Sequence, residues 1–431
     1  MNAVLQRVTH GSVTRVVGTE VELRGLRLAV GDAVDVHARG GARVAEVVAV
    51  DTDGCRALVI GEVTGIARGD RVVPRTGPLT SPVGDGLLGR VVDGLGRPID
   101  DRGPIVAPRR GVDGSAPSAL DRRRIADPLA TGVRLVDTLC TVGRGQRLGL
   151  FAGSGVGKST LLAMMVRGTD ADRSVIALVG ERGREVHEFI EDVLGPEGLT
   201  RAAVVVATSD QPALLRVRAA MLATRIAEEW ADAGRDVLLT VDSITRLATA
   251  QREIGLAAGE PPTSRGYPPS VFALLPRLLE RSGPRTHGTI TAFYSVLVEG
   301  GDLDEPVADA ARSILDGHIV LDRALTTAGR FPSIDPLASL SRLASTVTPP
   351  DRLAAAAAVR RSLAAAERVR DLVEVGAYVA GSDPVADAAL EHQESLTEFL
   401  CQVPDEVADV EESWERLEAL AEELRPSEVA A

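Results

Sequence analysis

One segment of the chain carries the residue types that bind the phosphates of a nucleotide: Gly153, Ser154, Gly155, Val156, Gly157, Lys158, Ser159 and Thr160. Glycines at this density let consecutive backbone N–H groups point inward around phosphate oxygens, and the N-terminus of a following helix favours their negative charge. In this pattern Lys158 reaches the β- and γ-phosphates and the Ser159 hydroxyl binds Mg²⁺. An apolar run at 148–151 precedes the segment and a helical pattern over 161–165 follows it, so we expect a phosphate-binding loop between a strand and a helix.

The lysine of this segment is the single lysine among the 48 basic residues of the chain. The preference for arginine runs through the whole sequence and fits a GC-rich coding genome. A compact ammonium fits among phosphate oxygens where a planar guanidinium does not. Chance survival is the alternative, but the retention of Lys158 supports a phosphate-binding role.

Two acidic residues directly follow apolar strand candidates further along the chain. Asp242 ends the run 237–241, and Glu181 follows the run 175–179 after one glycine. A carboxylate at the carboxyl end of a parallel strand faces the crevice where nucleotides bind. Asp242 is therefore a candidate ligand of Mg²⁺, and Glu181 is a candidate base for an attacking water. Taken alone, such acids are also typical of loop caps.

These residues need an α/β body with a largely parallel sheet to bring them together. Between about residues 145 and 345, apolar strand candidates alternate with longer stretches of helical spacing, which is typical of that architecture. The strand candidates are 148–151, 175–179, 202–207, 237–241, 289–296 and 318–321.

The flanking parts of the chain have a different character. Short β segments with glycine turns between them indicate a small N-terminal barrel, and they lie at 13–17, 21–23, 43–50 and 57–60. After Pro350 the spacing becomes helical, with Asp351 as a candidate N-cap and Gly376 as a stop. Apolar positions of these helices are Val369, Leu372, Val373, Trp414, Leu417, Leu420 and Leu424.

We therefore predict three domains. They are an N-terminal β-barrel over 1–83, a central α/β nucleotide-binding domain over 84–347 and a C-terminal helical domain over 348–431. The central domain includes a Gly-, Pro- and Arg-rich linker that extends to about residue 125. Three successive arginines at 122–124 in this linker are interpreted as a solvated face, with nucleic-acid contact as the alternative.

Composition restricts the class of protein. The chain has 431 residues, 45% hydrophobic and 25% charged, which argues against disorder. A net charge of −13 argues against a protein that coats nucleic acid. No apolar run is long enough for a membrane helix, and no signal-peptide pattern is present. Because Cys55, Cys140 and Cys401 lack paired or metal-like spacing, we expect a soluble protein of the reducing cytoplasm.

The order of the motifs carries a family resemblance. The phosphate loop is followed by Gly180-Glu181-Arg182-Gly183-Arg184-Glu185, then Asp242-Ser243-Ile244-Thr245-Arg246, then Gly266-Tyr267-Pro268-Pro269. This arrangement resembles the catalytic core of the hexameric rotary-type ATPases, which is a RecA-like P-loop fold, and most of all the branch that serves bacterial flagellar and type III protein export. The likeness covers nearly the whole chain from about residue 12, through the segments 82–93, 131–134, 143–147, 251–256, 279–283, 298–300, 312–321, 376–378 and 381–384.

The resemblance implies a role for each matched residue. Lys158 and Ser159 would hold the phosphates and Mg²⁺, Asp242 would bind the metal through water, and Glu181 would orient the attacking water. Two arginines are expected near the γ-phosphate, Arg182 and Arg246.

Three positions are compared separately with the family pattern. Ala152 stands where the phosphate loop usually has its first glycine, and a methyl group is often accommodated there. Phe331 stands where the family usually has an adenine-stacking tyrosine, so the aromatic face is kept. Arg342 matches the arginine finger that reaches into a neighbouring subunit's site, worth roughly 10³–10⁵ in rate. Because the non-catalytic alpha subunit of ATP synthase has glutamine in place of Glu181, the resemblance favours a homo-hexamer.

The implied function is ATP hydrolysis by a ring-forming motor that energises flagellar or type III protein export. Its tasks would be chaperone release, substrate unfolding and delivery to the export gate, with ATP and Mg²⁺ as cofactors. Expected partners are stator and stalk proteins, chaperone–substrate complexes and the membrane export gate, with no nucleic acid. The enzyme would lie at the inner face of the cell membrane through these partners. Only residues 1–10 precede the barrel, so stator docking by the family's N-terminal amphipathic helix is in doubt or shortened.

Three alternatives differ in class. A catalytic subunit of a rotary ATP synthase would share the core, but the segment 376–384 favours the export branch. A Rho-like RNA translocase would need stacking aromatics in its N-terminal domain, whereas residues 1–100 contain no Phe, Tyr or Trp. A nucleotide-binding subunit that never turns over would not need Glu181.

Overall fold

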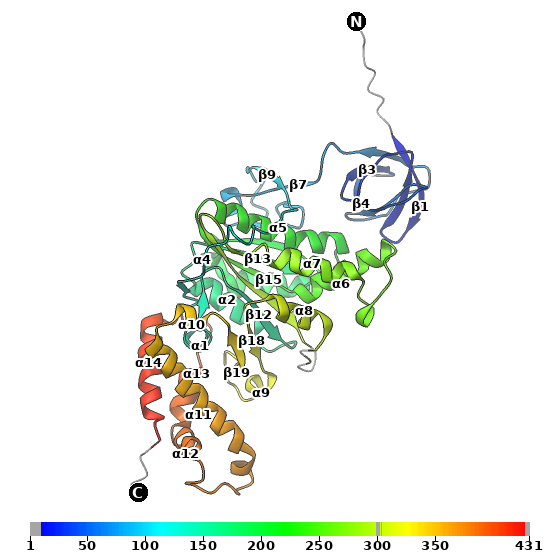
Figure 1. Ribbon diagram of the computed structural model, residues 1–431. Coiled ribbons are helices and arrows are strands. Elements are labelled where there is room, and N and C mark those ends of the chain that lie inside the picture. Colours follow the sequence, from blue (N-terminus) through cyan, green and yellow to red (C-terminus); the bar gives the residue numbers. More distant parts are fainter. Residues whose placement is uncertain (1–9, 299–301, 303, 427–431) are drawn as a thin grey trace.

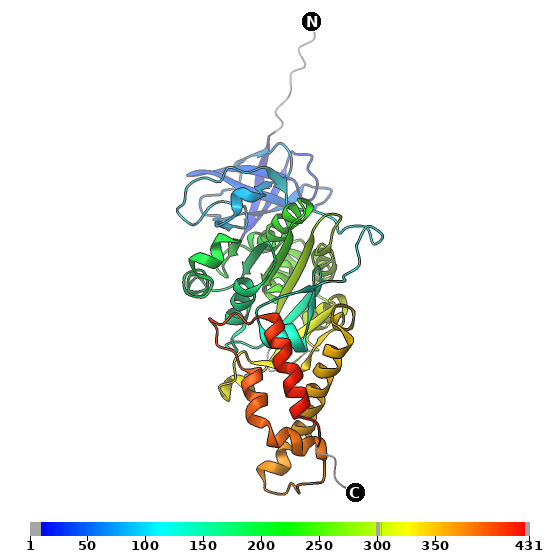
Figure 2. The ribbon, with the colours of Figure 1, turned by 90° about the vertical axis from the view of Figure 1, so that its left-hand side faces the viewer.

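Three units follow one another along the molecule in the computed structural model, which describes residues 10–298, 302 and 304–426. A β-barrel lies at one end, an α/β body in the middle and a group of helices at the other end (Figure 1 and Figure 2). The predicted fold class is confirmed. The predicted domain boundaries after residues 83 and 347 lie between secondary-structure elements and stay predictions. Apart from His10, the residues before the barrel lie outside the described part of the chain.

The barrel is closed by six strands in the order β1-β2-β5-β4-β3-β6. Alternating residues explain its core, because Val21 and Leu23 of one strand are buried while the glutamates beside them point outward. All four predicted β segments are strands, but β3 and β6 were missed because they carry Asp, His, Arg and Pro. The strands are β1 (Gly11–Val17), β2 (Glu20–Arg24), β3 (Ala33–Ala38), β4 (Gly41–Val50), β5 (Cys55–Val59) and β6 (Arg71–Pro74).

The body contains a nine-stranded sheet with the order β19-β18-β12-β17-β15-β13-β14-β8, and β16 pairs with β17. Its pairs are parallel except β18 with β19 and β16 with β17. All six predicted strands are present. The strands are β8 (Val91–Asp93), β12 (Arg147–Ala152), β13 (Arg173–Val179), β14 (Ala202–Ala207), β15 (Asp236–Asp242), β16 (Gly283–Pro284), β17 (Thr289–Leu297), β18 (Gly317–Leu321) and β19 (Ile334–Ser341).

Three strands of this sheet were not predicted: β8, β16 and β19. β16 has only two residues. β8 has three residues inside the linker and pairs with β14 at the edge of the sheet, so it was too short to give a periodic signal. β19 contains Pro336, which is tolerated because this strand is the antiparallel edge on the other side.

Helices cover both faces of the sheet, so its central strands are apolar throughout. Side chains of β13 alternate between two cores: Val175 and Ala177 pack with α5, α6 and α7, whereas Ile176 and Leu178 pack with α2. The helices of the body are α1 (Arg134–Leu139), α2 (Lys158–Gly168), α3 (Gly183–Glu188), a π-helix η2 (Phe189–Leu194), α4 (Gly195–Thr200), α5 (Ala213–Asp232), α6 (Ile244–Ala257), α7 (Pro269–Leu279), α8 (Pro306–Ile314), α9 (Arg323–Thr327) and α10 (Ala344–Val347).

Four helices form the C-terminal region: α11 (Pro350–Glu374), α12 (Pro384–Glu391), α13 (Gln393–Leu400) and α14 (Val410–Glu423). The predicted apolar face of the last helix is buried and shares a core with α2. Asp351 is not the N-cap of α11, because Pro349 caps the helix and Pro350 opens it. Leu372 and Val373 are partly exposed, unlike Val369. Within the described residues, no helix combines the length and apolar character that crossing a bilayer requires.

Short elements connect the barrel to the body. Two small sheets pair β7 with β9 and β10 with β11. Arg218 of α5 also pairs with Glu46 of β4 at 3.0 Å, which ties the barrel to the body. The connecting elements are β7 (Thr80–Pro82), η1 (Asp85–Leu87), β9 (Arg109–Gly111), β10 (Pro128–Leu129), β11 (Val142–Gly143) and, beyond α6, η3 (Ser264–Gly266).

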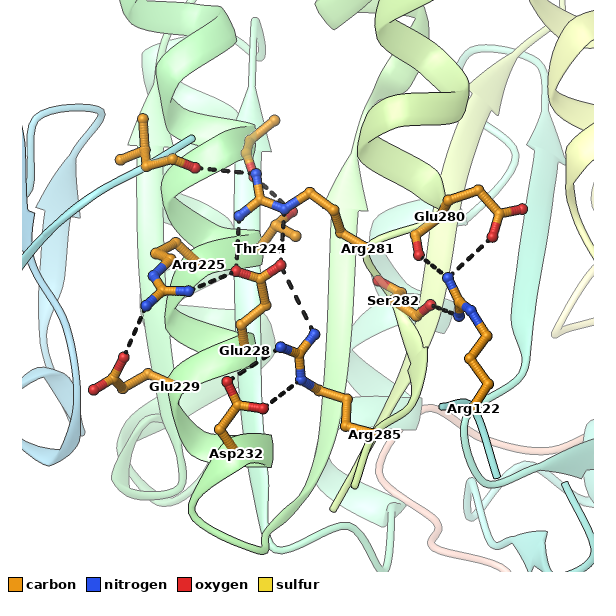
Figure 3. Close-up of polar contacts among 12 residues, drawn as sticks. Arg122, Thr224, Arg225, Glu228, Glu229, Asp232, Glu280, Arg281, Ser282 and Arg285 are labelled. Carbon is orange, nitrogen blue, oxygen red and sulfur yellow. Dashed lines mark hydrogen bonds and ion pairs between the residues drawn. The ribbon is translucent and has the colours of Figure 1, made fainter. Parts of the chain in front are cut away.

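The solvated face that we predicted at 122–124 is only partly present, because Arg123 and Arg124 are exposed whereas Arg122 is half-buried. Arg122 donates to the Ser282 carbonyl at 2.9 Å and pairs with the Glu280 carboxylate at 3.1 Å, with only 19% of its side chain exposed. Arg123 donates to the Arg285 carbonyl at 2.9 Å. Arg122 and Arg123 therefore fasten the linker to the turn between α7 and β17, and Figure 3 shows the contacts of Arg122.

A buried ion-pair network lies beside this linker. Arg281 donates to both carboxylate oxygens of Glu228 at 2.8 Å and to the Val112 carbonyl at 3.0 Å (Figure 3). Arg225 and Arg285 approach the same carboxylate at 3.1 and 3.9 Å. Side-chain exposure is 1% for Arg281 and 2% for Glu228. The network joins α5, the α7–β17 turn and the linker.

Breaking this network from one side should destabilise the protein. In Arg281→Met, the Glu228 carboxylate stays buried with weaker compensation, so we expect a loss of about 3 kcal/mol in unfolding free energy. The double variant Arg281→Met, Glu228→Leu should recover most of that loss because no buried charge remains. Urea unfolding followed by circular dichroism measures both. Equal stability of the wild type and the single variant would contradict the prediction.

Candidate active site

The predicted phosphate loop connects β12 to α2. Gly155 and Gly157 have φ angles of 76° and 89°, and Gly157 is the N-cap of α2 in the left-handed conformation. Lys158 is the first residue of the helix. The N-terminus of α2 therefore points into the concave side of the loop, which is the geometry of an anion-binding site.

Two side chains from a distant part of the chain donate hydrogen bonds to backbone carbonyls of this loop. Arg323 donates to the Ser154 carbonyl at 2.8 Å, and the Ser333 hydroxyl donates to the Val156 carbonyl at 2.5 Å. Both contacts occupy loop carbonyls, so these oxygens are turned away from a bound anion. Our sequence analysis missed both residues, because no local pattern relates them to a loop 169 and 177 positions earlier.

Lys158 and two carboxylates form the centre of the site. The Lys158 Nζ lies 2.5 Å from Asp242 Oδ1 and 3.6 Å from Glu181 Oε1. The Ser295 hydroxyl donates to the same Asp242 oxygen at 2.5 Å. Asp242 ends β15 beside Leu178 of β13, and Glu181 follows β13 after Gly180. Adjacent parallel strands thus place both acids at one edge of the sheet, as predicted.

Glu181 has the electrostatics of a base. Burial, aided by the nearby Asp242 charge, raises the pKa of its carboxyl to about 7 against the opposing effect of Lys158. Its Oε1 is buried and has no hydrogen-bond partner among the described residues. A carboxylate with a pKa near neutrality and a free oxygen can accept a proton from water.

The phosphate loop and Glu181 line a cavity of about 420 Å³. Arg182 and Arg246 both line it, and each is exposed; Arg182 pairs with Glu185 at 3.2 Å. A methyl group on Gly180 would lie 2.7 Å from the Cβ of Arg246, so glycine there allows the arginine to reach the cavity. The predicted loop residues that line the cavity are Gly153, Ser154, Gly155, Gly157, Lys158, Ser159 and Thr160.

The oxygen donors fit a magnesium ion carried by the nucleotide. Ser159 is exposed at the cavity, whereas Asp242 lies behind Lys158 with 4% of its side chain exposed. Mg²⁺ usually takes one or two protein oxygens together with phosphates and water. Ser159 can therefore reach the ion directly, and Asp242 can reach it through a water. No cluster of three acidic, His or Cys ligands occurs among residues 10–298, 302 and 304–426.

A second cavity of about 540 Å³ meets the first at Gly157 and Thr160. Phe331 lines it and is 43% exposed, so its ring is available to a planar ligand. The loop between α13 and α14 also lines this cavity, through residues that include Val403 and Pro404. The position fits a nucleobase attached to phosphates in the first cavity, and adenine stacking by Phe331 stays a prediction.

Asp242 and Val156 line neither cavity, and the third predicted site residue outside both linings is Arg342. It directly follows β19, is exposed and donates to the Arg312 carbonyl at 3.4 Å. Val156 is also absent from the lining of the cavities because its side chain is buried beneath the loop. The other predicted residues are brought together.

Two further residues were missed by the sequence analysis. Glu185 lines the cavity, and a hydrogen bond between its carboxyl and that of Glu181 contributes to the raised pKa of Glu181. Glu185 belongs to the motif that begins at Gly180, so its closeness in sequence to Glu181 could have identified it as a site residue. Ser295 lies within the apolar strand β17, where a small polar residue gives no pattern of its own.

Comparison with known families and proteins agrees with this geometry. Residues 132–341 match the ATP synthase alpha/beta family, nucleotide-binding domain, and residues 348–419 match the T3SS EscN ATPase C-terminal domain. The chain is 49% identical to the flagellum-specific ATP synthase of Bacillus subtilis over 95% of each chain. It is 48% identical to the type 3 secretion system ATPase of Xanthomonas euvesicatoria, over 96% of this chain and 94% of that protein.

Solved structures show the same likeness. The assembled ATPase EscN from the enteropathogenic E. coli type III secretion system matches with a TM-score of 0.90 and 43% identity, over 95% of this chain and 100% of that one. The same ATPase in complex with its central stalk EscO matches with a TM-score of 0.89 and 42% identity, with equal coverage.

The raised pKa of Glu181 predicts a pH-dependent effect on stability. The folded protein binds a proton on Glu181 more readily than the unfolded chain does, so this group costs stability as pH rises from its ordinary value of 4.5 toward about 7. Glu181→Gln removes that cost. We expect the variant to exceed the wild type by about 1–3 kcal/mol near pH 8 and by much less near pH 5.

Thermal unfolding at the two pH values measures this difference. Glu188→Gln, which removes an exposed carboxylate from α3, is the control and should show little dependence on pH. A Glu181→Gln effect that is the same at both pH values would disprove the pKa shift.

Proposed function

Because the chain belongs to the ATP synthase alpha/beta family, and within it to the flagellum-specific and type 3 secretion ATPases, we propose that its ATPase activity energises protein export. One observation carries this proposal. Glu181, with a free oxygen and a pKa near 7, faces Lys158 at the end of a phosphate loop. The match of residues 348–419 to the secretion ATPase C-terminal domain favours export over the alternative of an ATP synthase subunit.

The chain's own groups divide the reaction between them. The loop N–H groups and Lys158 hold the β- and γ-phosphates, and Glu181 Oε1 receives a proton as the water oxygen bonds to the γ-phosphorus. The bond from that phosphorus to the β–γ bridging oxygen breaks, giving ADP and phosphate. Ser159, and Asp242 through a water, would hold Mg²⁺, which would neutralise phosphate charge. Arg182 and Arg246 are proposed to stabilise the γ-phosphate oxygens.

The position of Arg342 supports an active site shared between subunits. Its side chain is exposed and lines neither cavity of its own chain. We therefore propose that Arg342 enters the site of a neighbouring copy as an arginine finger. Identical copies arranged head to tail close into a ring, and we propose a homo-hexamer. The match to an assembled secretion ATPase agrees with this arrangement.

Partners and location follow from the same family membership. The relative solved with its central stalk supports a stalk protein at the centre of the ring. We further propose contacts with a stator protein, with chaperone–substrate complexes and with a membrane export gate of the flagellar or type III kind. These partners would hold the enzyme in the cytoplasm at the inner face of the cell membrane.

Mixing two inactive variants tests the shared site. Glu181→Gln should abolish hydrolysis in its own site but still supply Arg342, and Arg342→Ala should do the reverse. Random mixed rings then restore about a quarter of the sites, because those sites combine an intact Glu181 with a neighbour's Arg342. The ATPase rate of the mixture, measured against protein concentration, shows this recovery. Full activity of Arg342→Ala alone would overturn the shared site.

Stacking by Phe331 predicts a change in nucleotide affinity. Phe331→Ala should raise the KM for ATP about tenfold, since stacking of a base on an aromatic ring is worth about 1–3 kcal/mol. The value of kcat should change little because Phe331 lies in the second cavity, away from Glu181. Phe331→Tyr keeps the ring and is the matched control, expected near wild-type KM. An unchanged KM in the alanine variant would place the base elsewhere.

A further inference from the structure

The segment Thr131–Arg134 resembles its counterpart in the family but has no role in the proposed reaction. Asp137 gives the segment its shape by accepting from the Thr131 N–H and hydroxyl at 2.8 and 2.7 Å and from the Gly132 N–H at 3.0 Å. Arg134 then begins α1. The segment therefore presents the Gly132 carbonyl and the Arg134 side chain in fixed positions.

A loop about 270 residues further along the chain binds to these groups. The Gln402 amide donates to the Gly132 carbonyl at 2.8 Å and accepts from the Arg134 N–H at 2.9 Å. The Arg134 guanidinium donates to the Cys401 carbonyl at 2.9 Å and the Phe399 carbonyl at 3.3 Å. It also pairs with the Glu406 carboxylate.

Residues 401–406, which we call the base wall, are part of the boundary of the second cavity. Cys401, Gln402 and Glu406 all line it, as Phe331 does. The Gln402 N–H also donates to the Phe331 carbonyl at 2.8 Å. The same few groups therefore fix both sides of the space where the nucleobase is proposed to bind.

The contacts are strong enough to define this space. Arg134 and Gln402 are each only 5% exposed. A buried guanidinium or amide that loses its partners pays a large desolvation penalty, so the base wall cannot move away without water replacing these contacts. The planar fork of arginine binds several acceptors at once in a fixed geometry, which a flexible ammonium does not do.

We propose that Arg134 and Gln402 are positioning residues for nucleotide binding, which hold the base wall against the core and thereby set the width of the nucleobase cavity. Neither side chain needs to touch the reacting phosphates. The proposal rests on the proposed ATPase function, and it predicts that these residues affect ligands with a base and not ligands consisting of phosphate alone.

Binding of ADP and of pyrophosphate, each with Mg²⁺, separates these effects. In Arg134→Gln the Kd for ADP should rise about tenfold by calorimetry, while the Kd for pyrophosphate stays within about twofold. Glu406→Gln removes the partly exposed carboxylate that pairs with Arg134, and it should raise the Kd for ADP about two- to threefold. Arg134→Lys should recover part of the loss. In ATPase assays, KM should rise and kcat should stay within about twofold.

A second buried arginine serves as the matched control. Arg281→Gln disturbs the Glu228 network (Figure 3), whose residues line neither cavity. It should lower the unfolding temperature without changing the ratio of the two Kd values. Equal weakening of ADP and pyrophosphate in Arg134→Gln, or no weakening of ADP, would overturn the proposal. If Arg134→Gln does not fold, the Glu406→Gln result decides. A wild type that binds neither ligand would instead refute the proposed ATPase function.

Discussion

The contact of one ammonium group with two carboxylates is the constraint on which the rest of the site depends. Lys158 lies on the helix after the phosphate loop, whereas Asp242 and Glu181 end two neighbouring strands. Two negative charges share one positive charge in a space with little water, so the Glu181 proton is held more tightly than in solution. Phosphate oxygens entering this space add negative charge that Lys158 alone cannot balance, and this is why a divalent ion and further arginines belong to the chemistry.

The remaining architecture keeps these three charges in register. Parallel pairing of β13 with β15 brings two acids to the same sheet edge, and the two cores on either side of the sheet prevent the strands from shifting. Contacts from distant segments complete the arrangement: Ser295 fixes Asp242, while Arg323 and Ser333 fix the loop. The network around Glu228 joins α5 to the linker and to the turn between α7 and β17.

Sequence patterns predicted most of the sheet and most of the lining of the first cavity, but in the second cavity they predicted only Gly157, Thr160 and Phe331. Long apolar strands and the loop glycines have local signals, because burial on both faces and left-handed backbone positions restrict residue choice. Short edge strands such as β8 gave no signal. The hydrogen-bond partners of arginine side chains gave no signal either. Arg122 was expected in solvent but binds backbone carbonyls, and the partners of Arg134 lie about 270 positions away. Such contacts depend on tertiary packing, which no local spacing encodes.

The presence of a single lysine, Lys158, has a practical consequence. Acylating reagents scatter over many surface amines in most proteins, but this chain offers one side-chain amine, which is 11% exposed and lies between two carboxylates. Besides the α-amino group, covalent labelling of amines therefore reports the occupancy of the phosphate loop alone. The folded protein carries a built-in, single-site probe of its own ligand state.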